Sequence, residues 1–303
     1  MFEGATITLQ TGRHELREHL DECLKTRWRR FRRQIKRRQE PSQKGVHKLR
    51  VEARRVIAVL AVMPSIVAGH EPDRLERRIK DAFRGSAGLR DTHVRMLLIE
   101  KESESFPELK PLRKVLRKRE KRLVQRFEKC LKCVRRAKLN KSIRHLRKCL
   151  RHALHTSASE ERGLRALLKE VQRAHRRTVV LLRRARQCPS GKASPARIHR
   201  VRVAFKKFRY MVEVLEPLIA GLASMELRQM HNWQDTLGEI QDTDLLRIFV
   251  AKRQAKRGNG TWDRYLEHLD ERQKHLISEF LASADQLLEF WPPNRGPFVR
   301  KRR

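Results

Sequence analysis

Residues 46–56 read VHKLRVEARRV, and residues 198–208 read IHRVRVAFKKF. In each segment a histidine near the beginning is followed by cationic residues three and seven positions later. A second pair of similar segments, LRDTHV at 89–94 and IQDTDL at 240–245, follows in the same order. The two pairs are 152 and 151 positions apart, which is half of the 303-residue chain. The sequence therefore predicts an internal duplication.

Both segments predict amphipathic helices with two parallel stripes. Apolar residues recur at steps of three and four, which places them on one face that packs against a core. They are Val46, Leu49, Ala53, Val56 and Leu60 in the first helix and Ile198, Val201, Phe205, Phe208, Val212 and Leu215 in the second. About 100° round the helix lies a cationic stripe. It consists of His47, Arg50 and Arg54 in the first copy and His199, Arg202, Lys206 and Arg209 in the second, widened by Lys48, Arg55, Arg200 and Lys207.

Cations stacked along one helix face repel one another by a few tenths of a kcal/mol per pair. A single stripe of this kind is usually a solvated face, whereas its presence in both copies favours a polyanionic ligand. Both stripes begin in the first turns of their helices, where free N–H groups and the helix dipole attract anions. His47 and His199 also have a structural interpretation, as partly buried side chains beside a carboxylate. Asp91, Asp242 and Asp244 are the expected structural partners of the cations.

The composition favours a basic, mostly helical protein. The chain has 73 Lys and Arg against 35 Asp and Glu, a formal net charge of +38, which attracts polyanions. Only 13 glycines and 11 prolines occur, which favours helices. The longest apolar run, 56–63, is too short to cross a bilayer, and the N-terminus lacks the pattern of a secretory signal. The five cysteines are therefore expected to be reduced thiols in a cytoplasmic protein.

Periodicity and loop residues predict helices over most of the chain. In the first half we expect helices over 13–39, 42–63, 71–103 (with kinks at Gly85 and Gly88), 107–138 and 140–155. In the second half we expect them over 160–187, 194–216, 223–257 and 261–290. Ser194 and Pro195 are a cap and a first helical residue. The segment 157–160 is the expected joint between two halves, 1–158 and 159–303.

The sequence resembles a known family, the CHAD domain, whose name stands for conserved histidine α-helical domain. The two His-x-x-Arg-x-x-x-(Arg/Lys)-(Arg/Lys) segments carry the resemblance. Residues 88–94 and 237–245 resemble the family's Leu-Gly-x-x-(Arg/Asn)-Asp-x-Asp-Val motif, and 142–146 resembles its Ser-x-Arg-Tyr element. The resemblance implies two pseudo-symmetric helical bundles around a basic channel that binds inorganic polyphosphate. It implies as binding positions His47, Arg50, Arg54, Arg55, His199, Arg202, Lys206, Lys207, Arg209 and Tyr210.

The chain departs from the family pattern at several positions. Ile57 occupies a place where the family often has a further arginine, so the first stripe is expected to bind less tightly. His93 replaces the second aspartate of the first acidic motif, and Gln241 replaces Arg or Asn in the second. The Glu-x-Glu-x-Lys motif of the CYTH triphosphate-processing domain, sometimes fused to CHAD, is missing; 102–106 comes nearest and lacks the lysine.

Three other constellations come close to catalytic or metal motifs. A phosphate loop is not expected at 191–194, because Arg186 stands where the first glycine belongs. His14 and His19 are five positions apart rather than the four of the zinc protease signature. Cys130 and Cys133 have the spacing of half a structural zinc site, but His145, Cys149, His152 and His155 form no clean second pair. The interpretation as core cysteines is preferred.

Nucleic acid is the main alternative ligand. Nine cations in fourteen residues, from Lys25 to Arg38, would bind DNA or RNA through counterion release. Only 6% of residues are aromatic, and no recognition motif is present, so we expect at most sequence-independent binding. The tryptophans Trp28, Trp233, Trp262 and Trp291 are expected in the core and at interfaces rather than as stacking platforms.

The sequence as a whole predicts an all-α, duplicated helical protein of about four long helices in each half. The predicted function is non-catalytic binding of inorganic polyphosphate, with no cofactor, no metal and no membrane contact. Arginine and lysine would contact phosphate oxygens, with arginine able to bind two oxygens at once. Weak nonspecific nucleic-acid binding is the alternative. The expected location is the cytoplasm, with a possible association with polyphosphate granules.

Overall fold

The computed structural model describes residues 15–36, 42–187, 194–219, 224–258 and 260–291. Every regular element in these ranges is a helix, so the predicted all-α fold is confirmed. The predicted duplication, its pseudo-symmetry and the channel stay predictions. The α-helices are α1 (Glu15–Lys36), α2 (Gln43–Val62), α3 (Glu71–Arg84), α4 (Ser86–Glu102), α5 (Lys110–Lys132), α6 (Arg136–Ala153), α7 (Ser157–Arg186), α8 (Pro195–Leu215), α9 (Ser224–Arg257), α10 (Asp263–Ser283) and α11 (Gln286–Glu289). Short 3-10 helices cover Met63–Ser65, Pro107–Leu109 and Glu216–Leu218.

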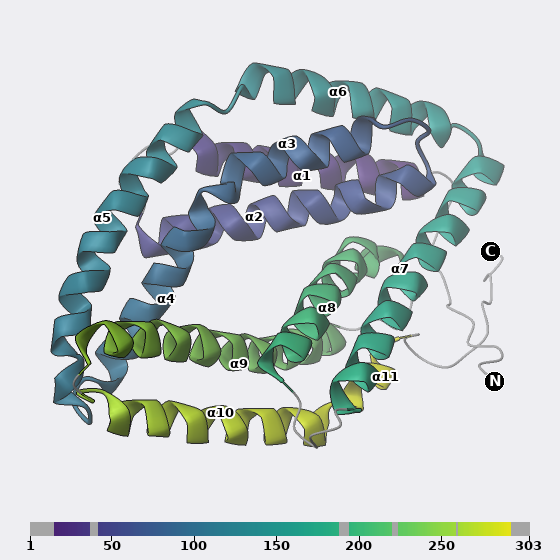
Figure 1. The fold of residues 1–303 in the computed structure, drawn as a ribbon. Helices are drawn as coiled ribbons and strands as arrows, with labels where there is room; N and C mark the ends of the chain where they lie inside the picture. The colour runs from purple at the N-terminus through teal and green to yellow at the C-terminus, as the bar shows by residue number, and fades with distance from the viewer. Residues whose placement is uncertain (1–14, 37–41, 188–193, 220–223, 259, 292–303) are drawn as a thin grey trace.

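Helices α5, α6, α7 and α10 form a frame around the two stripe-bearing helices (Figure 1). Figure 1 shows α5, α6, α7 and α10 along successive edges of the molecule, with α2 and α8 inside them. Helix α2 packs against α1, α3 and α8, whereas α8 also packs against α7 and α9. The helices that carry the acidic motifs, α4 and α9, contact each other as well. The repeated segments, half a chain apart in sequence, therefore lie side by side.

The main hydrophobic core draws on both predicted halves of the chain. Leu20, Val56 and Leu146 from the first half and Val171 and Phe208 from the second belong to one buried cluster. The helix-start contact at Thr156, a capping box with Ser159, places the beginning of α7 at Ser157. The predicted boundary between 158 and 159 falls in the first turn of this helix and stays a prediction.

A second, smaller core lies where α4 and α5 meet α9 and α10. It contains Ile99, Phe106, Leu109, Leu112, Leu116, Leu246, Phe249, Val250, Trp262, Tyr265 and Leu269. The Tyr265 hydroxyl donates a hydrogen bond of 2.6 Å to Glu102, and burial together with this carboxylate raises the pKa of Tyr265. The indole of Trp262 donates to the Glu108 carbonyl at 2.8 Å. This core joins the far ends of the two halves.

Three predicted helices differ from the observed ones: those expected over 71–103 and 261–290 are each broken in two, the latter between Ser283 and Gln286, and the one expected over 107–138 ends early. The helix predicted over 71–103 breaks at Gly85, where an added Cβ would lie 3.0 Å from Cys130 Sγ of α5. The helix predicted over 107–138 ends at Lys132, and α6 starts four residues earlier than expected. No proline or glycine marks this second turn. It occurs because Leu139, Ile143, Leu146 and Leu150 of α6 enter the main core.

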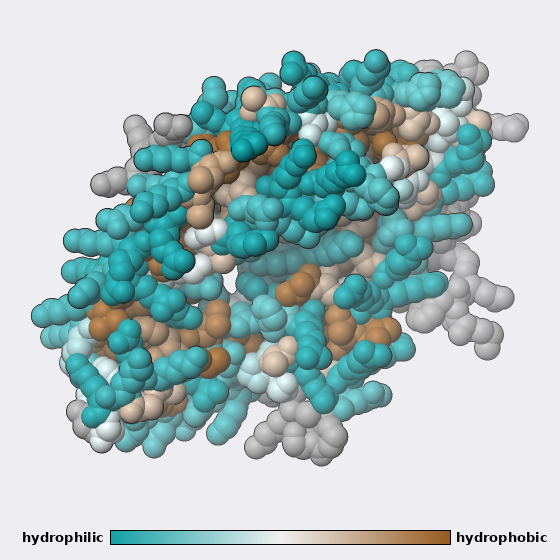
Figure 2. Space-filling view, turned by 45° about the horizontal axis from the view of Figure 1, so that its top comes forward, coloured by the Kyte–Doolittle hydropathy of each residue, from teal (hydrophilic) through white to brown (hydrophobic). Residues whose placement is uncertain are grey.

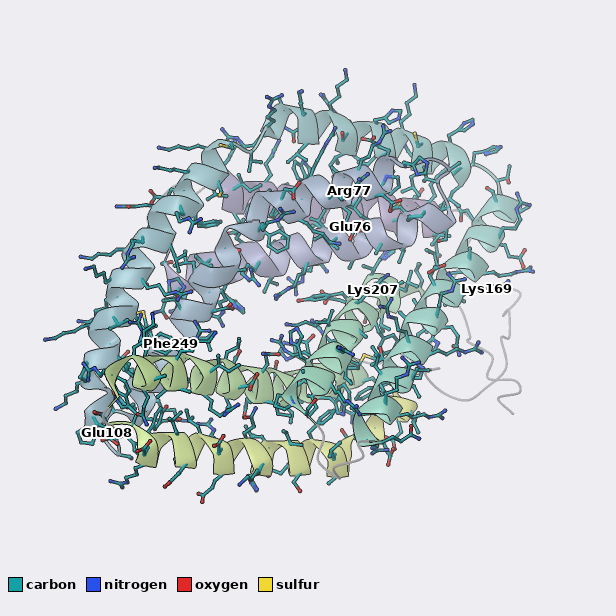
Figure 3. All side chains as sticks on the ribbon, in the orientation of Figure 1. Glu76, Arg77, Glu108, Lys169, Lys207 and Phe249 are labelled. Carbon is teal, nitrogen blue, oxygen red and sulfur yellow. The ribbon has the colours of Figure 1, made fainter. Side chains whose placement is uncertain are left out.

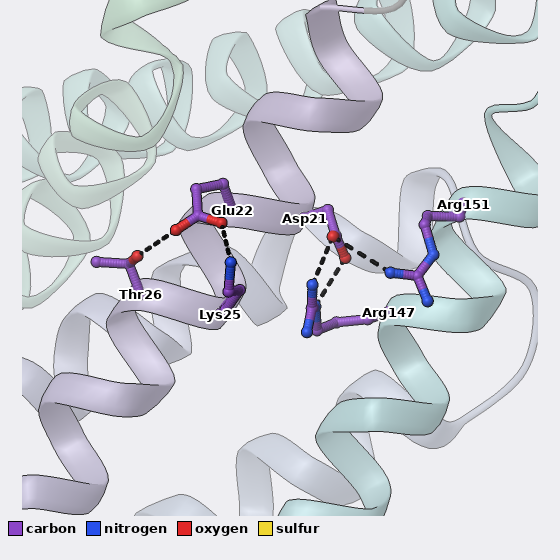
Figure 4. Close-up of polar contacts among 6 residues, drawn as sticks. All are labelled: Asp21, Glu22, Lys25, Thr26, Arg147 and Arg151. Atoms are coloured by element: carbon purple, nitrogen blue, oxygen red, sulfur yellow. Dashed lines mark hydrogen bonds and ion pairs between the residues drawn. The ribbon is translucent and has the colours of Figure 1, made fainter.

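An ion-paired contact fixes α6 against α1 (Figure 4). Asp21 of α1 accepts hydrogen bonds from Arg147 Nε at 2.8 Å and Nη2 at 2.6 Å, and from Arg151 Nη1 at 3.3 Å. The hydrogen bond to Asp21 raises the pKa of Arg147. Glu22, one residue later, accepts instead from Lys25 and Thr26 of its own helix, each at 2.8 Å.

The four tryptophans are buried, as predicted. Trp28, for example, lies in the main core and donates its indole N–H to Asn140 of α6 at 2.9 Å. None of the described helices combines the length and the apolar character that a bilayer span requires.

Candidate functional site

The predicted apolar stripes of α2 and α8 are buried throughout, which fixes the direction of the cationic stripes beside them. Each helix begins at a serine cap: Ser42 accepts from the Gly45 N–H at 3.1 Å, and Ser194 accepts from the Arg197 N–H at 3.4 Å. Since α2 and α8 also pack against each other, the stripe cations of the two helices meet inside the frame.

We call the group formed by Arg50 and Arg54 of α2 and Arg202 and Lys206 of α8 the central cluster. All four side chains are partly buried. Burial lowers the pKa of Arg202, and Arg54 across the helix pair lowers it further. The pKa of Lys206 falls to about 6, through burial first and then through Arg54, Arg202 and Arg50. The four cations are thus close enough to repel one another.

The charged form of Arg50 is disfavoured by burial and by neighbouring cations as well. Burial lowers its pKa to about 10, and Arg54, Arg90 and Arg202 act in the same direction. Its guanidinium donates a hydrogen bond of 3.1 Å to the Ser86 hydroxyl and lies 5.8 Å from the centre of the Phe83 ring. The first residue of α4 and the end of α3 therefore hold Arg50 in place without neutralising it.

The acidic motifs approach the central cluster from α4 and α9. Asp91 opposes the pKa decrease of Arg50 and Arg202, and Asp242 opposes that of Arg202 and Lys206. Burial raises the pKa of Asp242 itself, although Arg202 and Arg90 act to lower it. Neither carboxylate forms a direct ion pair with the central cluster within the described ranges. Asp91 and Asp242 thus act on the central cluster through longer-range electrostatics and not as direct ion-pair partners. The role predicted for Asp244 stays a prediction.

Arg202 retains unused hydrogen-bonding capacity. Its Nε is buried and has no hydrogen-bond partner in the part of the chain that the structure describes. Its guanidinium lies near Gly238 of α9, where an added Cβ would be 4.0 Å from Arg202 Nη2, an ordinary contact distance. A buried donor without a partner costs about 1–3 kcal/mol, and an acceptor supplied by a ligand would recover it.

Three other arginines share a single carboxylate. Glu213 of α8 lies 3.2 Å from Arg27 of α1, 3.0 Å from Arg55 of α2 and 3.6 Å from Arg209 of α8. We call this group the Glu213 hub. Burial disfavours the charge of Arg55, but Glu213 and Glu52 outweigh it and raise the pKa of Arg55. The hub lines one side of a cavity of about 670 Å³ whose other side is the beginning of α9.

The predicted binding positions are therefore divided among three surroundings. Arg50, Arg54, Arg202 and Lys206 form the central cluster, whereas Arg55 and Arg209 belong to the Glu213 hub. The buried ring of Tyr210 lies below the guanidinium of Arg209, 4.4 Å from ring centre to Cζ. His47, His199 and Lys207 are exposed (Lys207 is labelled in Figure 3). Partial burial lowers the pKa of His47, and Arg90, Arg54, Arg50 and Lys206 lower it further.

Two arginines of α4 were not among the predicted binding positions. Arg90 acts on the pKa values of His47, Arg50 and Asp242, so it lies at the edge of the central cluster. Arg95 is half-buried with its guanidinium 5.4 Å from the centre of the Phe249 ring, and burial lowers its pKa. Figure 3 shows Phe249 where α9 passes α4. Arg90 stands directly before Asp91 in the acidic motif, which is a signal the sequence already contained.

His93, the residue that departs from the acidic motif, lies against α5. Its Nε2 lies 2.9 Å from Glu120 of α5, and the ring is fully buried. Burial lowers the pKa of His93 despite this carboxylate. The substitution thus joins α4 to α5 instead of adding a negative charge near the arginines.

The cysteines lie apart from the central cluster. Cys23, Cys130, Cys133 and Cys149 are free thiols; Cys188 lies outside the described residues. Cys130 is in the last turn of α5 and Cys133 follows its end, and both are exposed beside a cavity of about 360 Å³. The expectation that they are core residues is therefore wrong, because the chain turns outward between α5 and α6. No metal-binding group of three His, Cys, Asp or Glu occurs within the described ranges.

The space between the helices is open to at least one side. Figure 2 shows the forward face hollowed near its centre, with hydrophilic residues around the hollow. A site of this composition, rich in guanidinium and ammonium donors, suits phosphate oxygens, because charge-assisted hydrogen bonds to phosphate are about twice as strong as neutral ones.

Comparisons with known proteins agree with this architecture. The sequence profile of the CHAD domain matches residues 16–251. The crystal structure of the CHAD domain from the plant Ricinus communis is similar in fold, with a TM-score of 0.61 and 15% sequence identity over 97% of this chain and 91% of that one. No curated protein sequence matches the chain. Since the profile spans most of its length, including both histidine segments and both acidic motifs, the chain belongs to the CHAD domain family.

Proposed function

We propose that this protein binds inorganic polyphosphate, without changing it, through the central cluster. The observation that carries the proposal is the group of four cations that face each other from α2 and α8 with no direct carboxylate partner in the described ranges. Such a group is destabilising in the free protein, because burial and like charges both oppose it. A linear polyanion between the helices would supply the missing negative charge.

A polyphosphate chain fits the requirement better than a single phosphate or a nucleotide does. The cations are distributed over two helices and continue at the exposed ends through His47 and His199. A repeating ligand can contact all of them in succession, whereas a small anion would satisfy only two or three. Phe205 and Phe208 of α8 are buried in the core, and the partly buried ring of Phe83 lies against the Arg50 guanidinium, so these aromatic side chains are engaged within the protein.

Binding without hydrolysis is part of the proposal. Phosphoryl transfer commonly depends on a metal ion held by carboxylates and on a positioned nucleophile. Asp91 and Asp242 are the acidic side chains near the cations, and both act on arginines rather than forming a metal-binding group with a third ligand. Polyphosphate incubated with the pure protein, with or without Mg²⁺, is therefore expected to keep its length on a gel, with no more orthophosphate released than by a heat-killed sample.

A competition experiment tests the proposed ligand. Labelled long-chain polyphosphate and a DNA duplex, at equal phosphate concentration and physiological salt, are titrated against each other on the full chain. We expect polyphosphate to remain on the central cluster when duplex is added, because a flexible single chain can follow partly buried cations on two packed helices, whereas a wide and rigid duplex cannot. Displacement of polyphosphate by equal duplex would contradict the proposal and favour nucleic acid as the ligand of this site.

A further inference from the structure

The outer edge formed by α5 and α6 carries a strong excess of positive charge. Residues 110–151 contain 19 Lys and Arg and only 2 acidic residues. Of these acids, Glu120 already lies beside His93. The opposite edge differs: α10 has 3 Lys and Arg against 5 acidic residues. The positive charge is therefore segregated onto α5 and α6 rather than spread evenly over a basic protein.

Eight exposed lysines, which we call the lysine face, run along these two helices. On α5 they are Lys114, Lys118, Lys121, Lys129 and Lys132, and on α6 they are Lys138, Lys141 and Lys148. Their steps of three and four, with Gln125 and His145 at the intervening positions, place them on one side of each helix. Within the described ranges none of the eight has a carboxylate partner, whereas Arg147 and Arg151 of the same α6 are held by Asp21.

The lysine face lies on the exposed side of α5 and α6. In Figure 3 the side chains of α5 and α6 extend outward from the edges of the frame, on the side opposite to α2. At about 1.5 Å per residue, the 23 residues of α5 extend about 35 Å, which is close to one turn of duplex DNA. A ligand on this edge would not have to enter the space between α2 and α8.

The residue types of the lysine face favour one class of polyanion over the others. Single-stranded nucleic acids are bound through aromatic side chains on which bases stack, but Phe127, the aromatic residue of α5, is buried, and α6 has no Phe, Tyr or Trp. An anionic membrane would favour exposed apolar residues beside the lysines, and the large exposed hydrophobic residues all lie on other helices. Lysines without either feature suit the two phosphate rows of a duplex, which they contact as point charges.

We propose that the lysine face binds the backbone of double-stranded nucleic acid, without sequence preference, independently of the central cluster. One molecule would then have a phosphate-binding site inside the frame and a second one on its outer edge. This differs from the location that the sequence suggested, Lys25 to Arg38. In that segment Lys25 and Arg27 are paired with Glu22 and Glu213, and residues 37 and 38 lie outside the described ranges.

The test compares two variants of the full chain that lose the same charge. The test variant is Lys118→Gln, Lys121→Gln and Lys129→Gln on α5. The matched control is Lys169→Gln, Arg176→Gln and Arg177→Gln, three exposed cations of α7 (Lys169 is labelled in Figure 3). Binding of a labelled 24-base-pair DNA of mixed sequence is measured by fluorescence anisotropy over a salt series, after circular dichroism has shown equal helix content.

We expect the test variant to flatten the slope of log affinity against log salt by about three units, at about 0.9 per lost contact, and the control by less than one. A third variant, Arg202→Gln with Lys206→Gln, should bind the duplex as the wild type does, which keeps this proposal separate from that of polyphosphate binding. Equal effects of the test and control variants would overturn it, because binding would then follow net charge alone. Loss of duplex binding in the third variant would also overturn it. So would a larger effect of the test variant on binding to anionic vesicles than on binding to DNA.

Discussion

The central cluster and the Glu213 hub use the same residue types on neighbouring turns of the same two helices, yet their charges are balanced differently. Arg55 follows Arg54 directly, and Arg209 lies less than one turn beyond Lys206. In the hub, the Glu213 carboxylate forms ion pairs with three arginines, at distances of up to 3.6 Å. In the central cluster, the nearest acids act from α4 and α9 without direct contact.

The difference separates cations that hold the fold together from cations with capacity left for a ligand. Arg27, Arg55 and Arg209 join α1, α2 and α8 through Glu213, so each of them already has a direct carboxylate partner. In the free protein, burial together with Arg50, Arg54 and Arg202 disfavours the charged form of Lys206, and bound phosphate would favour that charged form again. A regular series of cations on one helix can therefore contain both kinds.

The largest expected effect tests the structural role of the hub. Glu213→Gln leaves three arginines without their shared carboxylate, and breaking a partly buried ion pair costs about 3 kcal/mol. The free energy of unfolding, measured by urea denaturation, should fall by that amount. Glu239→Gln, at an exposed position of α9, is the control and should change it by less than about 0.5 kcal/mol. If the two variants were equally stable, the hub would not be a structural contact.

The next effect concerns the central cluster. Arg202→Gln with Lys206→Gln should weaken polyphosphate binding about 100-fold, since each charge-assisted hydrogen bond contributes about 1.5 kcal/mol or more. The slope of log affinity against log salt should become shallower by about one unit, at about 0.7 per contact. Arg50→Gln with Arg54→Gln should act in the same direction but less strongly, because Ile57 leaves the first stripe shorter. Lys169→Gln with Arg176→Gln on α7 is the charge-matched control; a loss as large there would remove the distinction between site and net charge.

A third prediction concerns stability and pH. The pKa of Lys206 is about 6 in the folded protein against an ordinary 10.5, so between these values the unfolded chain binds more protons than the folded one. Stability should therefore rise with pH across this window, with this one group contributing up to about 1.4 kcal/mol per pH unit. Lys206→Met removes that contribution. Urea denaturation at pH 6.5, 7.5 and 8.5 should show its stabilising effect shrinking as pH rises; a difference from wild type that is the same at every pH would contradict the assignment.

The smallest effect concerns the two histidines at the exposed ends of the stripes. Burial and four neighbouring cations lower the pKa of His47 in the free protein, and bound polyphosphate would raise it again by favouring the imidazolium. Affinity should then increase a few-fold as pH falls from 8 to 6. His47→Gln with His199→Gln should flatten this profile. The measurement is made in a Lys206→Arg background, so that the lysine does not titrate; an unchanged profile would place the histidines outside the binding site.

Much of the molecule was predictable because its local patterns are strong. Steps of three and four located the buried stripes of α2 and α8 residue by residue, and the serine at 194 marked the beginning of α8. The turn between α5 and α6 was not predictable, because no glycine or proline marks it and only the packing of α6 on α1 and α3 requires it. For the same reason Cys130 and Cys133 were expected in a core and are exposed.

The sequence by itself determined the helical class, the family and the set of cations available for binding, since these depend on periodicity and on residue types. Only the tertiary structure decided how those cations are used. Glu213, which in sequence terminates the second stripe, proves to neutralise Arg55 of another helix, and Arg90 and Arg95 join from α4. Charge balance depends on distances between side chains that are far apart in the chain, and a linear pattern contains no information about which carboxylate will lie beside which cation.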